Sequence, residues 1–201
     1  MKQIIAVSGR SSAGKDILTR QASEKYHIPM VASYSDRAMR PTEKQGREHT
    51  FLSKEEMDNV LQKEHILAFT KINGCRYCVS KELLDSLPGD KIFYIIDPAG
   101  IQYFEQTHPE YEMFKLYVTA DFEVRKTRAI QRNGDTQTFI DRDNDEAAQF
   151  IDYEQSKAYD MVIYNNDKLE FAQKDFNHCI EHLLNKNKIT IYNKDDLDIE
   201  R

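Results

Sequence analysis

The segment IIAVSGRSSAGKD, residues 4–16, decides how this chain is expected to fold. It joins a short apolar run, Ile4 to Ser8, to a loop that matches the pattern G-x-x-x-x-G-K and spans Gly9 to Lys15. A loop of this kind lies between a buried strand and a helix, and its backbone N–H groups surround a phosphate. The glycines let the backbone turn tightly, and the lysine adds a mobile positive charge for the outer phosphates. The segment therefore predicts a nucleotide-binding α/β domain.

Asp16 departs from the usual form of this loop, in which Ser or Thr follows the lysine and holds Mg²⁺ with its hydroxyl. A carboxylate is also a competent oxygen ligand for Mg²⁺, and a helix N-terminus stabilises its charge. Two interpretations of Asp16 therefore stand: a Mg²⁺ ligand, or a helix cap that leaves the metal to phosphates and water. The loop is expected to bind ATP through Gly9, Arg10, Ser11, Ser12, Ala13, Gly14, Lys15 and Asp16.

Short apolar segments alternate with helical patterns along the rest of the chain, as expected of an α/β protein with a parallel sheet. These segments are apolar on both faces, which suits strands covered by helices on each side. Strands are predicted at Ile4 to Ser8, Ile92 to Ile96, Phe114 to Val118 and Met161 to Tyr164. Helices are predicted at Asp16 to Tyr26, Glu55 to Glu64, Glu123 to Arg132, Asp145 to Tyr159 and Leu169 to Leu184.

Two segments break this alternation. One, Ser33 to Ser80, is rich in charge and in β-formers, and the other, Asn133 to Asp145, is polar and has no helical periodicity. In a phosphotransferase, such segments serve as a substrate-binding insertion and a mobile lid. The predicted fold is an α/β P-loop kinase with a central parallel sheet flanked by helices, an acceptor-binding insertion and a lid. Its single domain has a core at 1–32, 81–127 and 146–184, the insertion at 33–80, the lid at 128–145 and a C-terminal tail at 185–201.

Composition excludes several other classes of protein. The chain has 201 residues and a formal net charge of −6, which argues against nucleic acid as the main partner. No apolar run approaches the roughly 20 residues of a membrane helix, and the N-terminus lacks a signal-peptide pattern. Cys75, Cys78 and Cys179 are expected to be reduced thiols of a cytoplasmic protein, because their number is odd and the chain shows no secretion signal. Their spacing does not favour a zinc site. A monomer or a homodimer is expected.

Asp97 follows a predicted strand, Lys91 to Ile96, at the edge of the sheet where α/β proteins bind ligands. Its carboxylate is expected to hold Mg²⁺ through water or to contact the phosphate acceptor. An ordinary turn aspartate at a strand end is the alternative.

The segment SYSDRAMRPTEKQGREHTFLS, residues 33–53, resembles the acceptor-binding stretch of the guanylate kinase family. That family has a serine, then R-x-x-R, E-x-x-G, and an aromatic residue followed by x-F-x-S, in this order and spacing. Further on, IYNND at residues 163–167 is similar to the V-N-D-D of the family. The resemblance spans residues 2 to 184, and it implies a nucleoside monophosphate kinase that uses ATP and Mg²⁺.

The resemblance also implies roles for individual residues. Ser33 would contact the acceptor's base, and Arg37, Arg40 and Tyr77 would hold its monophosphate. Two arginines three residues apart independently suit a forked clamp for a dianion. Asn165 would bind ATP, while Lys15 and the lid arginines would neutralise the transferring phosphoryl group. The lid arginines are Arg128, Arg132 and Arg142.

Three positions depart from the family pattern. His49 stands where the family usually has a phosphate-binding tyrosine, so its contribution is expected to depend on pH. Ala68, or Leu67 after a shift of one residue, and Ile95 stand where the family reads guanine with carboxylates. Losing an acceptor opposite a buried donor costs about 1 to 3 kcal/mol, which is enough to change the choice of base.

Two other functions are consistent with these residues. A kinase for a phosphorylated sugar, such as ribose 1,5-bisphosphate, would explain the missing base-reading acids. A non-catalytic interaction module that resembles the family is the other, although Lys15 and the lid arginines favour an enzyme. Phosphoryl transfer from ATP to a nucleoside monophosphate, GMP by resemblance, remains the main expectation.

Overall fold

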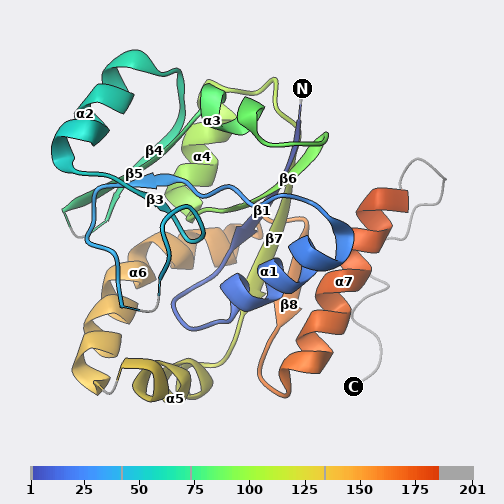
Figure 1. Ribbon diagram of the computed structural model, residues 1–201. Coiled ribbons are helices and arrows are strands. Elements are labelled where there is room, and N and C mark those ends of the chain that lie inside the picture. Colours follow the sequence, from blue (N-terminus) through green and yellow to red (C-terminus); the bar gives the residue numbers. More distant parts are fainter. Residues whose placement is uncertain (1, 42, 73, 134, 186–201) are drawn as a thin grey trace.

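A parallel sheet of four strands forms the centre of the computed structural model, which describes residues 2–41, 43–72, 74–133 and 135–185 (Figure 1). Its order is β6-β1-β7-β8, with β1 at Gln3–Ser8, β6 at Lys91–Ile95, β7 at Met113–Thr119 and β8 at Met161–Tyr164. The four predicted strands are thus confirmed, within a residue or two at their ends. All pairs in this sheet are parallel, so the carboxyl ends of the strands meet at one edge.

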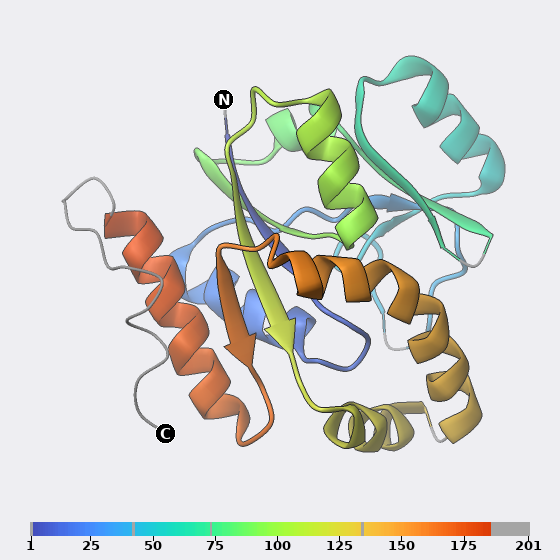
Figure 2. The ribbon, with the colours of Figure 1, turned by 180° about the vertical axis from the view of Figure 1, so that it is seen from behind.

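Helices cover both faces of this sheet because the side chains of β1 alternate between two apolar clusters. Ile5 and Val7 pack in one cluster with α1 (Lys15–Tyr26) and α7 (Leu169–Asn185). Ile4 and Ala6 pack in the other with α4 (Pro98–Thr107) and α6 (Thr136–Ser156). Figure 2 shows α1 and α7 on one side of the sheet and α4 and α6 on the other. The continuous apolar run of β1 therefore reflects burial on both faces.

Residues 33–80 form a second sheet of four strands, with order β3-β2-β5-β4. The strands are β2 (Tyr34–Ser35), β3 (Thr50–Phe51), β4 (Ile66–Ile72) and β5 (Cys75–Ser80), and α2 (Lys54–Lys63) lies between β3 and β4. Ser53 begins α2 with a reciprocal capping box, in which its hydroxyl accepts from the Glu56 N–H. Leu67 and Val79 join the apolar cluster that contains α4, so this small sheet is packed onto the core. A short helix, α3 (Lys81–Ser86), leads back to the central sheet.

The segment expected to be irregular, Asn133 to Asp145, is mostly helical, and that expectation was wrong. Helix α5 (Phe122–Asn133) is followed by α6, whose first turn is capped by Asp135. The Asp135 carboxylate accepts hydrogen bonds from the N–H groups of Gln137 at 3.0 Å and Thr138 at 3.1 Å. Phe139 and Asp143 are buried, and Asp143 pairs with the buried Arg125 of α5. Burial of these few side chains, rather than a regular apolar pattern, stabilises the helix.

The expected C-terminal tail, 185–201, begins at the last residue of α7, and its residues 186–201 lie outside the described part of the chain. Among the described residues, no helix is long and apolar enough to cross a membrane. The three cysteines are free thiols, of which Cys78 and Cys179 are buried.

We expect Phe176→Ala to destabilise the protein by about 3–5 kcal/mol, because the ring is fully buried and packs against Phe93 at 6.1 Å between centroids. Urea denaturation measures this change. Phe171 is the matched control, since it lies on the same helix and is 59% exposed. Phe171→Ala is expected to stay within about 0.5 kcal/mol of the wild type. Equal losses in the two variants would contradict this assignment of the core.

Candidate active site

The loop after β1 is held by close backbone packing at its two glycines. A Cβ atom on Gly9 would lie 2.3 Å from the carbonyl oxygen of Val118, at the end of β7. One on Gly14 would lie 2.3 Å from the side-chain nitrogen of Asn165, just after β8. Any other residue at either position would push the loop away from the sheet edge, so the glycines fix its position. Lys15 then begins α1, which places the loop at a helix N-terminus.

Asn165 connects the loop to Arg128, a half-buried arginine of α5. Its amide nitrogen donates to the Ala13 carbonyl at 2.8 Å, and its amide oxygen accepts from Arg128 Nη2 at 3.4 Å. Burial lowers the pKa of Arg128, and among the described residues its Nη1 has no hydrogen-bond partner. The buried hydroxyl of Ser12 also lacks a described partner. Two donors without acceptors beside this loop fit the oxygens of a phosphate.

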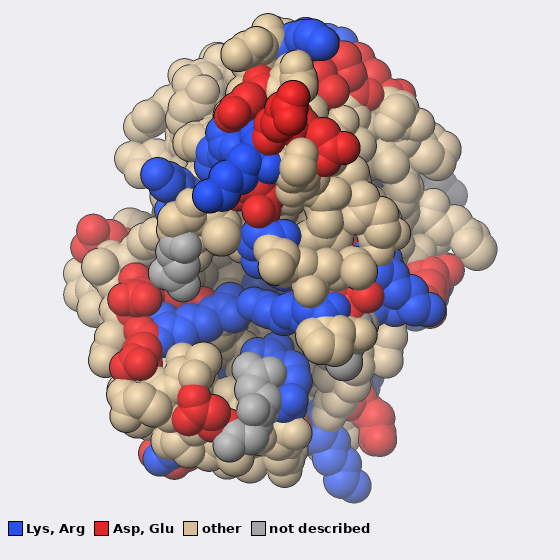
Figure 3. Space-filling view, turned by 60° about the vertical axis from the view of Figure 1, so that its left-hand side comes forward, with Lys and Arg blue, Asp and Glu red and all other residues tan. Residues whose placement is uncertain are grey.

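A cavity of about 350 Å³ opens beside the loop and brings together the three parts predicted to act on phosphate. Ser11 and Ser12 of the loop, Arg40 of the insertion, and Arg132 and Arg142 of α5 and α6 line it. Desolvation and the neighbouring charges of Arg37, Arg142 and Arg132 lower the pKa of Arg40. Figure 3 shows basic side chains gathered across the middle of one face of the molecule. Like charges crowded in this way favour the binding of a multivalent anion.

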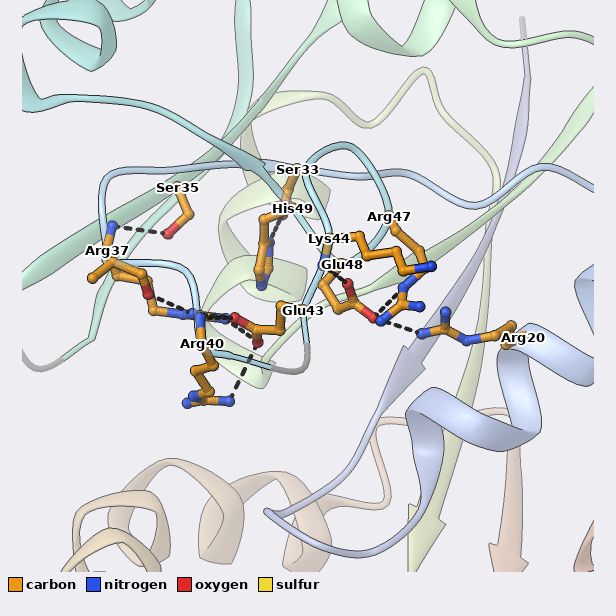
Figure 4. A network of polar contacts seen from close by, with 11 residues as sticks. Arg20, Ser33, Ser35, Arg37, Arg40, Glu43, Lys44, Arg47, Glu48 and His49 are labelled. Atoms are coloured by element: carbon orange, nitrogen blue, oxygen red, sulfur yellow. Dashed lines mark hydrogen bonds and ion pairs between the residues drawn. The ribbon is translucent and has the colours of Figure 1, made fainter. Parts of the chain in front are cut away.

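Arg37 and Arg40 are held by one carboxylate, that of Glu43 (Figure 4). The Arg37 guanidinium makes a bidentate pair with Glu43 at 2.7 and 2.6 Å, and the Arg40 N–H donates to the same carboxylate at 2.8 Å. Arg37 and Arg40 outweigh the effect of burial and lower the pKa of Glu43 to about 2. The first acid of the E-x-x-G stretch therefore positions the two arginines, a role that we did not assign from the sequence.

Ser33, His49 and Tyr77 lie together on the insertion sheet. The Ser33 hydroxyl is 3.0 Å from His49 Nδ1, and the rings of His49 and Tyr77 are 5.4 Å apart. Burial, with the nearby charge of Arg37, lowers the pKa of His49, so its ring is neutral at pH 7. A neutral ring has one donor and one acceptor, and it adds no charge for the acceptor's phosphate.

Asp97 caps α4 and also meets the hydroxyl of Thr70 on β4. Its Oδ1 accepts from the Gly100 N–H at 2.6 Å, while burial raises its pKa and the hydrogen bond from Thr70 opposes that rise. Thr70 pairs with Tyr77 in the sheet, and paired side chains lie on the same face. Thr70 and Asp97 therefore bring acceptor oxygens to the face that carries Tyr77.

The two positions expected to lack base-reading acids contribute to packing. Ala68 is 3% exposed in the cluster around α4, and Ile95 packs against the cluster around α1. No carboxylate could be accommodated at Ala68 without burying charge. Any acid that reads the acceptor's base must therefore come from another position.

Asp16 fits a Mg²⁺ site that consists mainly of phosphate and water. Its side chain is 65% exposed in the first turn of α1, and its Oδ2 lies 3.9 Å from the Lys15 ammonium. Within the described ranges, no group of three His, Cys, Asp or Glu side chains could hold a metal by itself. A single exposed carboxylate is a suitable Mg²⁺ ligand because this ion keeps several waters and nucleotide oxygens.

Comparisons with known proteins agree with this geometry. The sequence profile described as Guanylate kinase matches residues 1–183. This chain belongs to the guanylate kinase family. The chain is 28% identical to guanylate kinase from Fusobacterium nucleatum over 89% of its length and 96% of that protein. It is 29% identical to guanylate kinase from Aliivibrio fischeri over 87% of its length and 84% of that protein.

The fold of the family is also present in solved structures. The crystal structure of guanylate kinase from Anaplasma phagocytophilum matches with a TM-score of 0.67, covering 94% of this chain and 88% of that one at 21% identity. The resemblance drawn from the two sequence motifs and the α/β fold class are both confirmed.

The Arg10 side chain, expected at the ATP site, instead forms ion pairs with acidic residues of α6. Its guanidinium makes a bidentate pair with Glu154 at 3.1 and 3.0 Å, and Asp143 lies 3.9 Å away. We therefore expect only the backbone of Arg10 to contact a nucleotide. Sequence reasoning missed these acids because they follow Arg10 by more than 130 residues, and because Asp143 precedes the predicted helix Asp145 to Tyr159. In the structure both acids lie on one face of α6.

We expect Glu43→Gln to lower the free energy of unfolding at pH 7 by about 1–3 kcal/mol, because it removes the hydrogen-bonded charge between Arg37 and Arg40. The folded-state pKa of Glu43 is depressed, so its contribution is present above pH 4.5 and is lost as pH falls toward 2. Denaturation at pH 7, 5 and 3 measures this, and the difference between wild type and variant should shrink at pH 3. Exposed Glu24 on α1 supplies the control Glu24→Gln. A constant difference at all three pH values would refute the assignment.

Proposed function

We propose that this protein is an ATP-dependent nucleoside monophosphate kinase that catalyses GMP + ATP → GDP + ADP. The observation that carries the proposal is the convergence of Arg40, Arg132 and Arg142 on one cavity beside the phosphate loop. Such a site can neutralise two polyanions at once, one on the loop and one on the insertion. Membership of the guanylate kinase family supports GMP as the acceptor.

The donor half of the site would bind ATP. The N–H groups of the loop, Lys15 and the unpartnered donor of Arg128 would hold its phosphates, with Asn165 keeping Arg128 in place. Asp16 would hold Mg²⁺, which would offset charge on the outer phosphate oxygens. Asp97 is a second candidate to hold Mg²⁺, through a water molecule, although its hydrogen bonds favour contact with the acceptor.

The acceptor half would bind the nucleoside monophosphate. Arg37, Arg40 and Tyr77 would hold its phosphate, and Ser33 with Asp97 would contact its base. His49, neutral at pH 7, would orient Ser33 through their 3.0 Å contact. The small sheet at 33–80 thus acts as the acceptor-binding insertion.

Transfer would depend on positioning and on charge rather than on a general base, since the acceptor's phosphate is already ionised at neutral pH. The lid at 128–145, made of the end of α5 and the start of α6, would bring Arg132 and Arg142 onto the migrating group. Enclosure by these helices would also exclude water, which would otherwise hydrolyse ATP.

A release assay for ADP tests this proposal with ATP, Mg²⁺ and a panel of GMP, dGMP, AMP, UMP, CMP, IMP and ribose 1,5-bisphosphate. We expect GMP to be phosphorylated and Lys15→Ala to lower kcat at least about 100-fold, because Lys15 lies at the loop and helps neutralise the transition state. The melting temperature of the variant should match the wild type, since the ammonium of Lys15 is not part of the apolar core. If only ribose 1,5-bisphosphate is phosphorylated, the protein is a kinase for a phosphorylated sugar. If no compound of the panel is phosphorylated, it is a non-catalytic binding module.

Asp97→Asn is expected to lower kcat/KM for GMP by about 10- to 100-fold and to reduce the preference for GMP over AMP. The change replaces one acceptor oxygen by a donor, while Asn still caps α4 at the Gly100 N–H. The measurement is kcat/KM for GMP, IMP and AMP in both proteins, with thermal melting as the control for folding. If kcat/KM falls by the same factor for GMP, IMP and AMP, Asp97 does not read the base.

A further inference from the structure

A carboxylate of α6, Glu146, is bound directly to the phosphate loop. One of its oxygens accepts from the Ser11 backbone N–H at 2.7 Å, and the other accepts from the Ser11 hydroxyl at 2.7 Å. Arg142, one turn earlier on α6, donates to Glu146 at 2.9 Å. The charge of Arg142, the two Ser11 donors and Lys15 outweigh the effect of burial and keep the pKa of Glu146 below its usual value.

This arrangement repeats the interactions of a bound phosphate. A phosphate on the loop accepts hydrogen bonds from backbone N–H groups and is neutralised by basic side chains. Glu146 makes both kinds of contact, to the Ser11 N–H and to Arg142. An anion that needs the Ser11 donors must first displace this carboxylate, because two anions cannot share them.

The other acids of α6 that reach the loop do not compete for its donors. Asp143 and Glu154 pair with the Arg10 side chain, and the ring of Phe150 lies 5.9 Å below the same guanidinium. These residues follow one face of the helix and hold it against the loop. Glu146 alone of these acids uses the backbone of the loop, and α6 can remain docked through Arg10 when Glu146 leaves Ser11.

We propose that Glu146 is an internal competitor for the nucleotide's phosphate, a positioning residue that holds Arg142 at the loop and yields the Ser11 donors to ATP. The inference rests on the proposed function only in taking ATP as the ligand. Displacing Glu146 separates it from Ser11 and frees Arg142 to contact the phosphate instead. Arrival of the nucleotide and engagement of a lid arginine are thereby coupled, at the cost of a weaker apparent affinity.

The test is the Kd for MgATP and for inorganic tripolyphosphate, measured by calorimetry without any acceptor. Glu146→Gln keeps the shape but removes the charge, and we expect about tenfold tighter binding of both probes. Because a glutamine oxygen can still accept from Ser11, Glu146→Ala is the second variant, and its Kd should fall at least as far. Thermal melting of each variant shows whether it is folded.

Asp145→Asn is the matched control for the loss of charge alone. Asp145 is exposed, lies one residue earlier on the same helix and lines the cavity beside the phosphate loop. Removing its charge should tighten binding by no more than about twofold, since Asp145 is exposed and solvent and salt screen its repulsion of an anion. Equal gains in the Asp145 and Glu146 variants, or binding that is unchanged or weaker in both Glu146 variants, would overturn the proposal.

The binding assay separates this inference from the proposed function. Tighter MgATP binding in the Glu146 variants supports the inference even if GMP is not phosphorylated. Normal GMP kinase activity with no gain in affinity rejects the inference and leaves the function standing. A wild-type protein and Glu146 variants that all fail to bind MgATP would reject both.

Discussion

The site depends on how closely the phosphate loop after β1 approaches the ends of two neighbouring strands, β7 and β8. Gly9 touches the backbone at the end of β7, and Gly14 touches the Asn165 amide just after β8. Since neither place has room for a side chain, the loop has one position relative to the sheet. Asn165 hydrogen-bonds both the loop, at the Ala13 carbonyl, and Arg128 on α5, so the position of Arg128 depends on the position of the loop.

Carboxylates pair with the crowded arginines of this site and so reduce the repulsion between the arginine charges in the folded chain. Arg37 and Arg40 share Glu43, the buried Arg125 pairs with Asp143, and Arg142 pairs with Glu146. Each acid also fixes where its arginine lies, which is the positioning that phosphoryl transfer requires. The acids differ in what they would do when an anion arrives. Glu43 would keep holding Arg37 and Arg40 in place, whereas Glu146 would have to leave the Ser11 donors under the proposal above.

Apolar residues occupy the two positions at which acids are expected from the resemblance to the family. Ala68 and Ile95 pack in the apolar clusters on either side of the central sheet, where a charge would be costly. Asp97 and Thr70 provide oxygen atoms near Tyr77 instead, through a helix cap and a strand pairing. Under the proposed function, these two residues would supply contacts to the acceptor's base.

By itself the sequence determined the fold class and the family, and it predicted the phosphate loop and the arginine pair of the proposed acceptor clamp. These are local features, because a strand, a glycine loop or an R-x-x-R pair is encoded by residues next to each other. Helix α6 was only partly predicted, because its first turns are stabilised by the Asp135 cap and by burial of Phe139 and Asp143. Only the tertiary structure brought Glu146 to Ser11, Glu154 to Arg10 and Thr70 to Asp97. Those pairs are separated by 27 to 144 residues, and contacts at that distance follow from packing, which no local pattern records.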